Sequence, residues 1–341
     1  MAKITVVVPI YNVEKYLRKC FDSLLEQTFD DFVVMAVNDG SPDDSQTIID
    51  EYVNKYPQKI IGIKKPNGGY GSVLQMAIAR MESEYFLVCD PDDYLAKDAL
   101  AHLYQLASIG DCDLVIGAKN YIYDGSDRVD YDLAYNKHYV HLDVNKVYKR
   151  GSERFGDLLF VDPSPHSKLY RQKLAANIKF PTKVGYTDNL LFYVSLLNSN
   201  NVIYTDQACA YYLIDRPGNS MSDVSPKAID GNILVFKNVI SQCAALQAPD
   251  MFYYRMFESY KFILRELDRM LGDKEDVSQR LNSLYGLVEL LIPYRQQIFK
   301  VYGSYSKAKI VEKIKDRLLL EPKTSKLIYK DIMKKKLQNV A

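Results

Sequence analysis

Short apolar runs alternate with helical patterns through the first 120 residues, and no other feature constrains the fold as strongly. The runs with strand-forming composition are Ile4–Pro9, Phe32–Val37, Ile60–Lys64, Tyr85–Cys89 and Leu114–Gly117. Between the runs, apolar residues recur at helical spacing, first at Tyr16, Leu17, Cys20, Phe21, Leu24 and Leu25. Repeated strand–helix–strand units predict an α/β fold with a doubly wound, mainly parallel sheet and right-handed crossovers.

Polar residues follow four of these predicted strands directly. They lie at Tyr11–Asn12, Asn38–Gly40, Asn67–Gly71 and Asp90–Asp93. The carboxyl ends of parallel strands meet at one edge of a sheet, and ligands bind outside that edge. We therefore expect these polar residues to gather at one ligand site.

The Asp90-Pro91-Asp92-Asp93 segment places three carboxylates within four residues behind an apolar strand. Such a concentration of negative charge is unfavourable unless a cation offsets it. Mg²⁺ and Mn²⁺ favour carboxylate oxygens and leave coordination positions for phosphate. Taken alone, the segment fits a solvated turn with helix-capping aspartates equally well.

The pattern changes near Ser225 to long helices rich in Leu, Tyr, Ile and Lys. This change predicts one domain over residues 1–224 and an all-helical domain over 225–341. Residues 301–341 hold 11 Lys/Arg against 4 Asp/Glu, a local charge of +7. A basic amphipathic segment over 305–337 fits a membrane-surface helix, a helix docked on its own domain, or a contact with a second subunit of a homo-oligomer.

Several features indicate the compartment and the partners. No apolar run approaches the ~20 residues that cross a bilayer, and the N-terminal run is too short and Pro-interrupted for a secretory signal. The five cysteines are scattered without a C-x-x-C pair, which argues against zinc and disulfides and fits a reducing cytoplasm. The net charge is +1, and we expect no nucleic-acid partner, although the basic tail could attract anionic lipid or another polyanion. We expect a cytoplasmic protein, with peripheral contact at the inner face of the cell membrane as an alternative.

Three segments carry a family resemblance. They read V-V-V-P-I-Y-N at 6–12, V-N-D-G-S-P-D-D-S at 37–45 and Y-F-L-V-C-D-P-D-D-Y at 85–94. In motif, order and spacing they resemble family 2 glycosyltransferases, which are inverting, nucleotide-sugar-dependent enzymes of the GT-A fold. The resemblance covers about residues 3–222 and is weak over 120–160. It implies a bacterial enzyme that moves a sugar from a UDP-sugar to a hydroxyl of a growing surface glycan, a glycoconjugate or a lipid-linked glycan.

The resemblance also implies a nucleotide site. It puts the base and ribose against Pro9, Tyr11, Asn12 and Asp39. The Asp39 carboxylate would accept a hydrogen bond from the uracil imide N–H, and Tyr11 would offer an aromatic face. For Asp39 the alternative is an ordinary turn with a capping role.

The glycine-rich loop would hold the diphosphate. Glycines in the segment with Asn67, Gly68 and Gly71 allow close approach of the backbone to a ligand, and the following helix N-terminus favours phosphate. Many relatives carry Ala-Arg-Asn in that helix. This chain has Ser72-Val73-Leu74-Gln75 instead, so no arginine is available there for the nucleotide.

By the same resemblance, Asp92 is the principal ligand of Mn²⁺ or Mg²⁺, and Asp90 supports the metal site or binds ribose. Asp93 would then contact the sugar or support the site. The ion would ease departure of the diphosphate leaving group. His166 is a further candidate metal ligand, with a structural role as the alternative.

The family has a Glu-Asp pair that opens a helix well after the metal motif. Here Asp188 matches the aspartate, while Thr187 replaces the glutamate. Asp188 is therefore the candidate base that takes the proton of the acceptor hydroxyl. Its alternative role is an aspartate favoured by the helix dipole, and both roles can coexist.

Two weaker matches complete the predicted site. Lys168, in Ser167-Lys168-Leu169-Tyr170, would lie near the acceptor side of the pocket. Arg216 would stabilise phosphate charge or lie as an ordinary surface arginine. The rival functional hypothesis is a non-catalytic scaffold that keeps the nucleotide-sugar fold and recruits partners or membrane through its basic helices. Nucleotidyl transfer would require a Gly-rich, Arg/Lys-bearing loop after the first strand, which this chain lacks.

Overall fold

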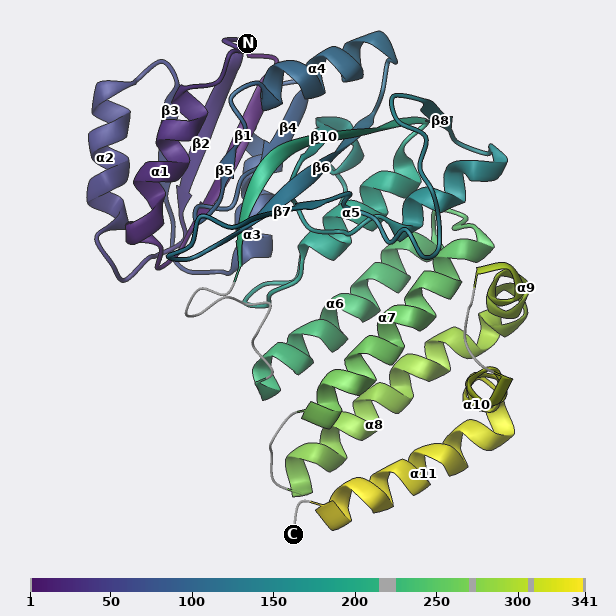
Figure 1. Cartoon of the computed structure of the whole chain (residues 1–341). Coiled ribbons are helices and arrows are strands. Elements are labelled where there is room, and N and C mark those ends of the chain that lie inside the picture. The colour runs from purple at the N-terminus through teal and green to yellow at the C-terminus, as the bar shows by residue number, and fades with distance from the viewer. Residues whose placement is uncertain (1, 215–224, 270–273, 306–309, 340–341) are drawn as a thin grey trace. The chain divides into compact units, whose positions relative to one another are not determined.

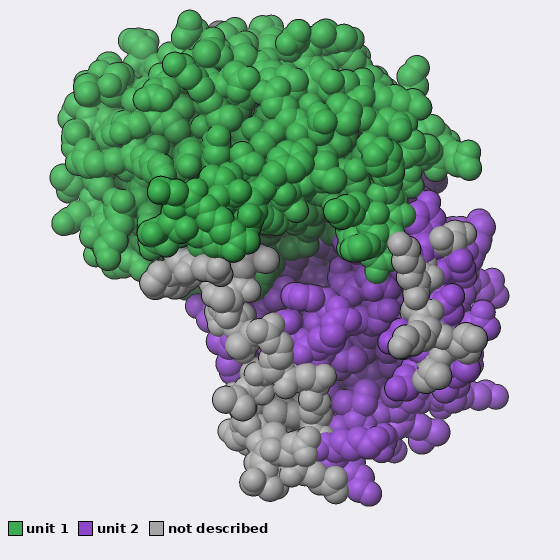
Figure 2. Space-filling view, viewed as in Figure 1, with its two compact units in different colours: residues 1–219 green, residues 220–341 purple. Residues whose placement is uncertain are grey.

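The computed structural model describes residues 2–214, 225–269, 274–305 and 310–339 (Figure 1). The chain divides into two compact units, residues 1–219 and residues 220–341 (Figure 2). We call them unit 1 and unit 2. The predicted boundary after residue 224 falls at the end of a segment outside the described residues, so that boundary stays a prediction.

Unit 1 is built on one ten-stranded sheet. The parallel strands β3 (Ile60–Lys64), β2 (Phe32–Asn38), β1 (Ile4–Ile10) and β4 (Tyr85–Val88) lie side by side in that order. The sheet continues with β9 (Lys168–Arg171), β6 (Leu114–Tyr123), β10 (Asn201–Ile214) and β5 (Tyr94–Leu95). Two short strands flank it, β7 (Val129–Asp132) beside β6 and β8 (Val147–Lys149) beside β10.

Helices cover both faces of the sheet because alternate strand residues point to opposite sides. Val6 and Val8 belong to the core that packs against α1 (Glu14–Leu25), α2 (Ser45–Lys55) and α4 (Ala99–Ile109). The opposite face includes Phe86, whose ring stacks on Tyr170 at 5.3 Å between centroids. On that face α3 (Tyr70–Arg80) contacts β1, and Phe192 of α5 (Asp188–Asn198) lies beneath Lys168. The predicted α/β class is confirmed.

The strand directions bring many chain segments to one edge. Strands β1 to β4 are parallel, so their carboxyl ends share that edge. Strand β9 runs antiparallel to both β4 and β6, so β9 begins where β4, β6 and β10 end. The edge therefore collects the residues that follow β1 to β4, those that precede β9, and the last residues of β6 and β10.

Unit 2 is helical over its described residues. Its α-helices are α6 (Pro226–Ala244), α7 (Asp250–Arg269), α8 (Lys274–Leu291), α9 (Arg295–Tyr305), α10 (Ile310–Leu319) and α11 (Pro322–Asn339). Helix α6 has a complete start signal, because the Ser225 hydroxyl accepts from the Ala228 N–H at 3.2 Å and Pro226 occupies the first turn. None of the helices in the described parts of the chain has the length and apolarity needed to span a bilayer.

Candidate active site

The carboxylate segment forms a tight turn directly after β4. The Asp93 N–H donates to the Asp90 carbonyl at 3.0 Å, which closes the turn. The Tyr70 hydroxyl donates to Asp90 Oδ1 at 2.8 Å. Burial raises the pKa of Asp90 to about 7, and the negative charges of Asp93 and Asp92 add to that rise. A divalent cation would offset this repulsion, so carboxylates of this turn suit a hard ion.

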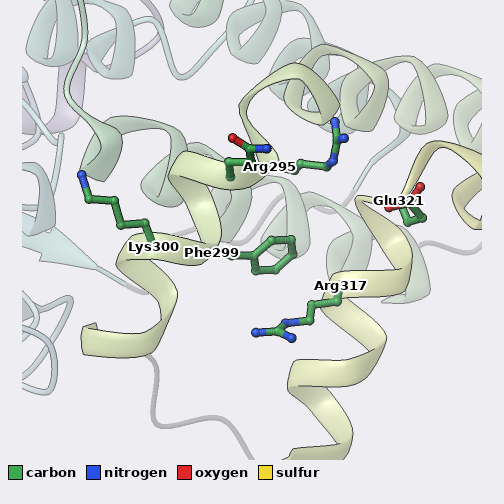
Figure 3. Close-up of a pocket in the computed structure, with 6 residues that line it drawn as sticks. Arg295, Phe299, Lys300, Arg317 and Glu321 are labelled. Atoms are coloured by element: carbon green, nitrogen blue, oxygen red, sulfur yellow. The ribbon is translucent and has the colours of Figure 1, made fainter.

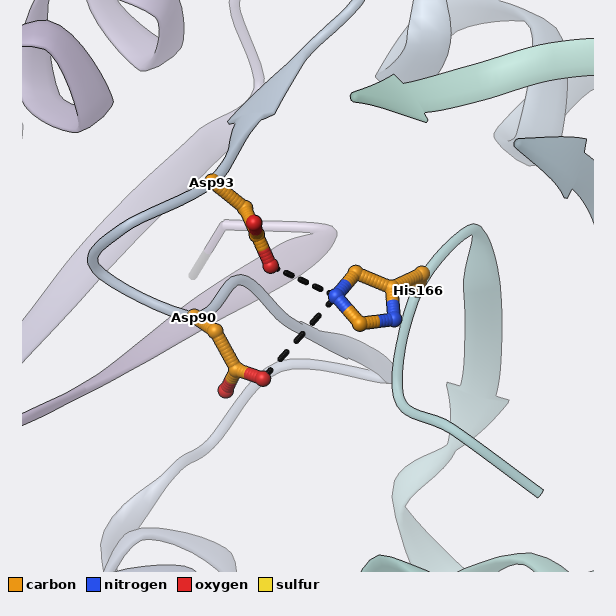
Figure 4. A group of neighbouring side chains, drawn as sticks. All are labelled: Asp90, Asp93 and His166. Atoms are coloured by element: carbon orange, nitrogen blue, oxygen red, sulfur yellow. Dashed lines mark hydrogen bonds and ion pairs between the residues drawn. The ribbon is translucent and has the colours of Figure 1, made fainter. Parts of the chain in front are cut away.

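Asp93 and His166 form a buried bridge behind that turn (Figure 4). His166 Nε2 lies 2.5 Å from Asp93 Oδ2 and 3.9 Å from Asp90 Oδ2. The other Asp93 oxygen accepts from the Leu213 N–H at 2.7 Å, which connects the turn to β10. The His166 ring also stacks on Tyr212, with 4.1 Å between centroids.

The protonation of His166 bears on whether it can bind a metal. Candidate ligand atoms of Asp90, Asp93 and His166 lie within 4.8 Å of one another. Burial lowers the pKa of His166 to about 4, so the ring is neutral and carries one proton. Its Nδ1 atom is buried without a hydrogen-bond partner in the described parts of the chain. The proton therefore belongs on Nε2, where Asp93 accepts it. If a metal bound His166 Nε2, the ring proton would have to move to Nδ1. That proton would then have no hydrogen-bond acceptor among the described residues.

The segments after β1 and β2 lie at the same edge. Tyr11 is 50% exposed, whereas Pro9 is buried inside β1. Asn12 adopts a left-handed conformation with φ of 56°, and its N–H donates to the Ser41 hydroxyl at 2.7 Å. Tyr11 is therefore available to a ligand, while Pro9 shapes the strand.

Asp39 is buried and organises the neighbouring glycine-rich loop. Its Oδ1 atom accepts from the Gly68 N–H at 2.9 Å and forms an ion pair with Lys65, and its Oδ2 accepts from the Gly69 N–H at 2.7 Å. Within the described residues, these donors leave one acceptor position on Oδ2. Lys65 was not among the predicted site residues, because a lysine after a strand forms no recognisable motif.

The glycine-rich loop packs against the segment that leads to Asp188. The Lys183 N–H donates to the Gly68 carbonyl at 2.7 Å. A Cβ atom on Gly71 would lie only 2.6 Å from the Pro181 carbonyl oxygen. Asn67 is exposed beside this contact. This packing contact alone explains why position 71 is a glycine, and no ligand is needed for the explanation. The sequence did not indicate the contact.

Asp188 is the first residue of α5 and is partly buried. Burial raises its pKa to about 6, and the charge of Asp162 adds to the rise. Backbone N–H groups at the helix start act in the opposite direction. The Tyr70 hydroxyl, which donates to Asp90 Oδ1, has its pKa raised by burial and by the negative charges of Asp90 and Asp188.

Two fully buried lysines act on Asp162 through their charge. Lys168 Nζ donates to the Ser164 carbonyl at 2.6 Å, and burial lowers the pKa of Lys168 to about 7. Lys119, near the end of β6, forms an ion pair with Asp162 and donates to the Ser164 hydroxyl at 3.0 Å. Lys119 and Asp162 were not predicted. Arg216 lies outside the described residues.

The comparisons with known proteins identify the family. The model of "Glycosyl transferase family 2" matches residues 5–179, so the chain belongs to this family, as the motifs indicated. The glycosyltransferase GlyA of Streptococcus pneumoniae is 30% identical over 220 residues, which are 63% of this chain and 31% of GlyA. A poly(ribitol-phosphate) beta-glucosyltransferase of Bacillus spizizenii is 27% identical over 64% of this chain and 33% of the relative. The chain thus spans about a third of the length of these two relatives.

Solved structures share the fold. Residues 1–349 of Staphylococcus aureus TarS in complex with UDP-GlcNAc match with a TM-score of 0.65 and 22% identity, over 88% of this chain and 89% of that one. The Pyrobaculum calidifontis mannosyltransferase PcManGT, in complex with GDP-Man and Mn²⁺, matches with a TM-score of 0.52 and 16% identity, over 87% and 83%. The predicted GT-A type of fold is confirmed.

Proposed function

We propose that this chain transfers a sugar from a UDP-sugar to a hydroxyl of a surface glycan or polyol-phosphate polymer, with inversion at the anomeric carbon. The carrying observation is geometric: the Tyr70 hydroxyl donates to Asp90 Oδ1 in the carboxylate turn at 2.8 Å, and the glycine-rich loop before Tyr70 is hydrogen-bonded to the segment that leads to Asp188 at the start of α5. The poly(ribitol-phosphate) relative and the TarS complex with UDP-GlcNAc support the choice of acceptor and donor.

The nucleotide occupies the segments after β1, β2 and β3 in this proposal. The remaining acceptor position on Asp39 Oδ2 takes the uracil imide N–H, and the exposed Tyr11 ring offers a face to the base. Asn12 and the loop with Asn67, Gly68 and Gly71 line the ribose and diphosphate.

We further propose that Asp90 and Asp92 hold Mn²⁺ or Mg²⁺. The donor set fits, because carboxylates crowd one turn and the pKa of Asp90 is raised by burial and by its acidic neighbours. When bound, the ion supplies positive charge to the diphosphate leaving group. Asp93 and His166 hold the turn in shape through their buried hydrogen bond.

Asp188 acts as the base in a single displacement. The acceptor oxygen forms a bond with the anomeric carbon while the bond to the diphosphate oxygen breaks on the opposite face. The acceptor proton passes to the Asp188 carboxylate. With a pKa of about 6, this carboxylate is ionised at neutral pH and more basic than an ordinary aspartate. Lys168 lies on the acceptor side and favours the ionised carboxylate.

The proposed location is the cytoplasm, at the inner face of the membrane, with unit 2 as the contact region. Ile314 and Leu318 are 52% and 42% exposed on the basic helix α10. A pocket of about 440 Å³ in unit 2 includes three basic residues in its lining, although Lys300 points away from Arg317 (Figure 3) and pairs with Asp250 at 2.8 Å. The lining residues are Arg295, Gln296, Phe299, Lys300, Arg317 and Glu321. Basic and apolar groups together suit an anionic lipid surface. Contact with a second copy of the chain stays the alternative.

The test combines donor binding with turnover. Purified protein is incubated with UDP-GlcNAc, Mn²⁺ and poly(ribitol-phosphate), and UDP release and polymer labelling are measured for the wild type and for Asp188→Asn. We expect transfer by the wild type, and loss of transfer with retained UDP binding in the variant. Equal turnover by both proteins would refute the role of Asp188. UDP binding without any turnover across a panel of UDP-sugars would favour the scaffold hypothesis.

A further inference from the structure

Asp162 is a half-exposed carboxylate that pairs with a buried cation, and its charge acts on the proposed base Asp188. The Asp162 side chain is 40% exposed, whereas the side chain of its ion-pair partner Lys119 is 0% exposed. The Ser164 N–H donates to Asp162 Oδ1 at 3.1 Å, while Lys119 binds Oδ2. Over the described residues, each carboxylate oxygen keeps one acceptor position. Lys119 and the Ser164 N–H hold the Asp162 carboxylate in place. A ligand that binds this carboxylate therefore costs little side-chain conformational entropy.

The family motif has a glutamate at the position of Thr187. A side chain at this position cannot contact an acceptor here. Thr187 is fully buried, and its Cγ2 atom lies 3.2 Å from the place where a Cβ on Gly71 would be. A side chain at 187 therefore faces the glycine-rich loop rather than solvent. If a second carboxylate contacts the acceptor, it comes from another segment.

We propose that Asp162, anchored by Lys119, binds a hydroxyl of the acceptor chain and so orients the reacting hydroxyl toward Asp188. This inference rests on the proposed function and names a binding residue for its acceptor. The ligand class is a polyhydroxyl chain, either a sugar or a polyol. An anionic carboxylate only accepts hydrogen bonds, so it selects O–H donors and repels phosphate oxygens.

The charge of Asp162 supports this assignment. Burial opposes its ionisation, but the neighbouring charges of Lys119 and Lys168 hold the pKa of Asp162 well below its usual range. The group is therefore an anion wherever the enzyme works. The half-buried rings of Tyr121 and Tyr212 flank Lys119 Nζ at 5.3 Å and 5.6 Å and add apolar surface beside the carboxylate.

The test measures binding of acceptor chains separately from binding of the donor. Saturation-transfer NMR follows two probes, poly(ribitol-phosphate) and cellotetraose, with the wild type and with Asp162→Asn. Calorimetry follows UDP with Mn²⁺. Loss of a hydrogen bond to a charged group lowers affinity about ten- to a hundredfold. We expect a loss of that size for at least one probe chain, and UDP affinity within twofold of the wild type.

Two further variants control for folding and for charge. Asp143→Asn removes a carboxylate of similar exposure, 33%, from an ion pair with Arg154, and should leave probe binding unchanged. The double variant Lys119→Met/Asp162→Asn removes both charges, so that no buried ammonium stays unpaired. It should lose probe binding as Asp162→Asn does while keeping a folded thermal transition.

A pH profile tests whether the charge of Asp162 acts on the proposed base. The charged and titratable groups around Asp188 are Asp162, Lys168, Tyr70 and Tyr170. Loss of the Asp162 charge lowers the pKa of Asp188, so the acid limb of transfer should move to lower pH in Asp162→Asn.

Probe binding that is equal in the wild type and Asp162→Asn would overturn the inference, and so would binding of neither probe to the wild type. Failure to bind UDP, together with intact and Asp162-dependent binding of a probe chain, would refute the proposed donor and leave the Asp162 site standing.

Discussion

Replacement of Gly71 by alanine tests whether this glycine is needed for packing against the segment at Pro181 or for contact with the nucleotide. The new Cβ would lie 2.6 Å from the Pro181 carbonyl oxygen and 3.0 Å from Phe180 Cβ. The first distance is too short for any packed structure, so the backbone must shift. Overpacking of this kind costs about 1–3 kcal/mol. Alanine is a better helix former than glycine by up to about 1 kcal/mol, which offsets part of that cost.

The expected net loss of stability for Gly71→Ala is about 1–2 kcal/mol. For a unit of this size each kcal/mol lowers Tm by about 2–4 °C, so thermal unfolding followed by circular dichroism should show a fall of roughly 2–8 °C. Gly185→Ala is the matched control in the contacting segment, because its Cβ would meet no atom within 4 Å. That control should stay within about 0.5 kcal/mol of the wild type.

Gly71→Ala should also lower the rate of sugar transfer. Because the shifted segment leads directly into Thr187 and Asp188, transfer should fall more than UDP affinity does. Calorimetry with UDP and a transfer assay measure the two effects. Unchanged Tm together with weakened UDP binding would refute the packing argument and assign Gly71 to nucleotide contact instead.

Four further outcomes are expected. Asp188→Asn should lower the rate of sugar transfer about 10²–10⁴-fold with UDP affinity retained. The wild-type transfer rate should rise with pH through about 6, because Asp188 loses its proton there. A wild-type rate independent of pH from 5 to 8 would contradict the role of Asp188 as base. Asp92→Ala should abolish the dependence of UDP affinity on Mn²⁺, measured by calorimetric titration, and an unchanged metal titration would count against Asp92 as a ligand. Gly286→Ala places a methyl group in open space inside α8 and should raise stability by about 0.5–1 kcal/mol in thermal unfolding. A lower Tm would contradict the open space around Gly286.

Much of the predicted site follows from local sequence because strand periodicity and polar strand ends are local signals. Asp39 and Asp90 each follow a predicted strand, and in the structure they lie at the shared edge of the sheet. Asp188 begins its helix as predicted. In each of these cases the chemistry-bearing residue and the element that positions it are adjacent in the chain.

Lys119 and Asp162 were not predictable in this way. They are 43 residues apart. The stretch between them forms the end of β6, the short strands β7 and β8, a 3₁₀ helix over Glu153–Phe160 and irregular segments, for which the sequence shows no clear period. The predicted strand ended at Gly117, whereas β6 continues to Tyr123 and carries Lys119 to the site edge. Lys65 was missed for a related reason, since only the folded loop brings its ammonium to Asp39.

The most direct test of the central claim is the stereochemistry of one turnover. Purified protein, Mn²⁺ and a panel of UDP-sugars are incubated with poly(ribitol-phosphate), and NMR of the product determines the anomeric configuration of the transferred sugar. We expect one UDP-sugar to be consumed, with UDP released and the anomeric configuration inverted. A product that retains the configuration of the donor would contradict a single displacement with Asp188 as the base.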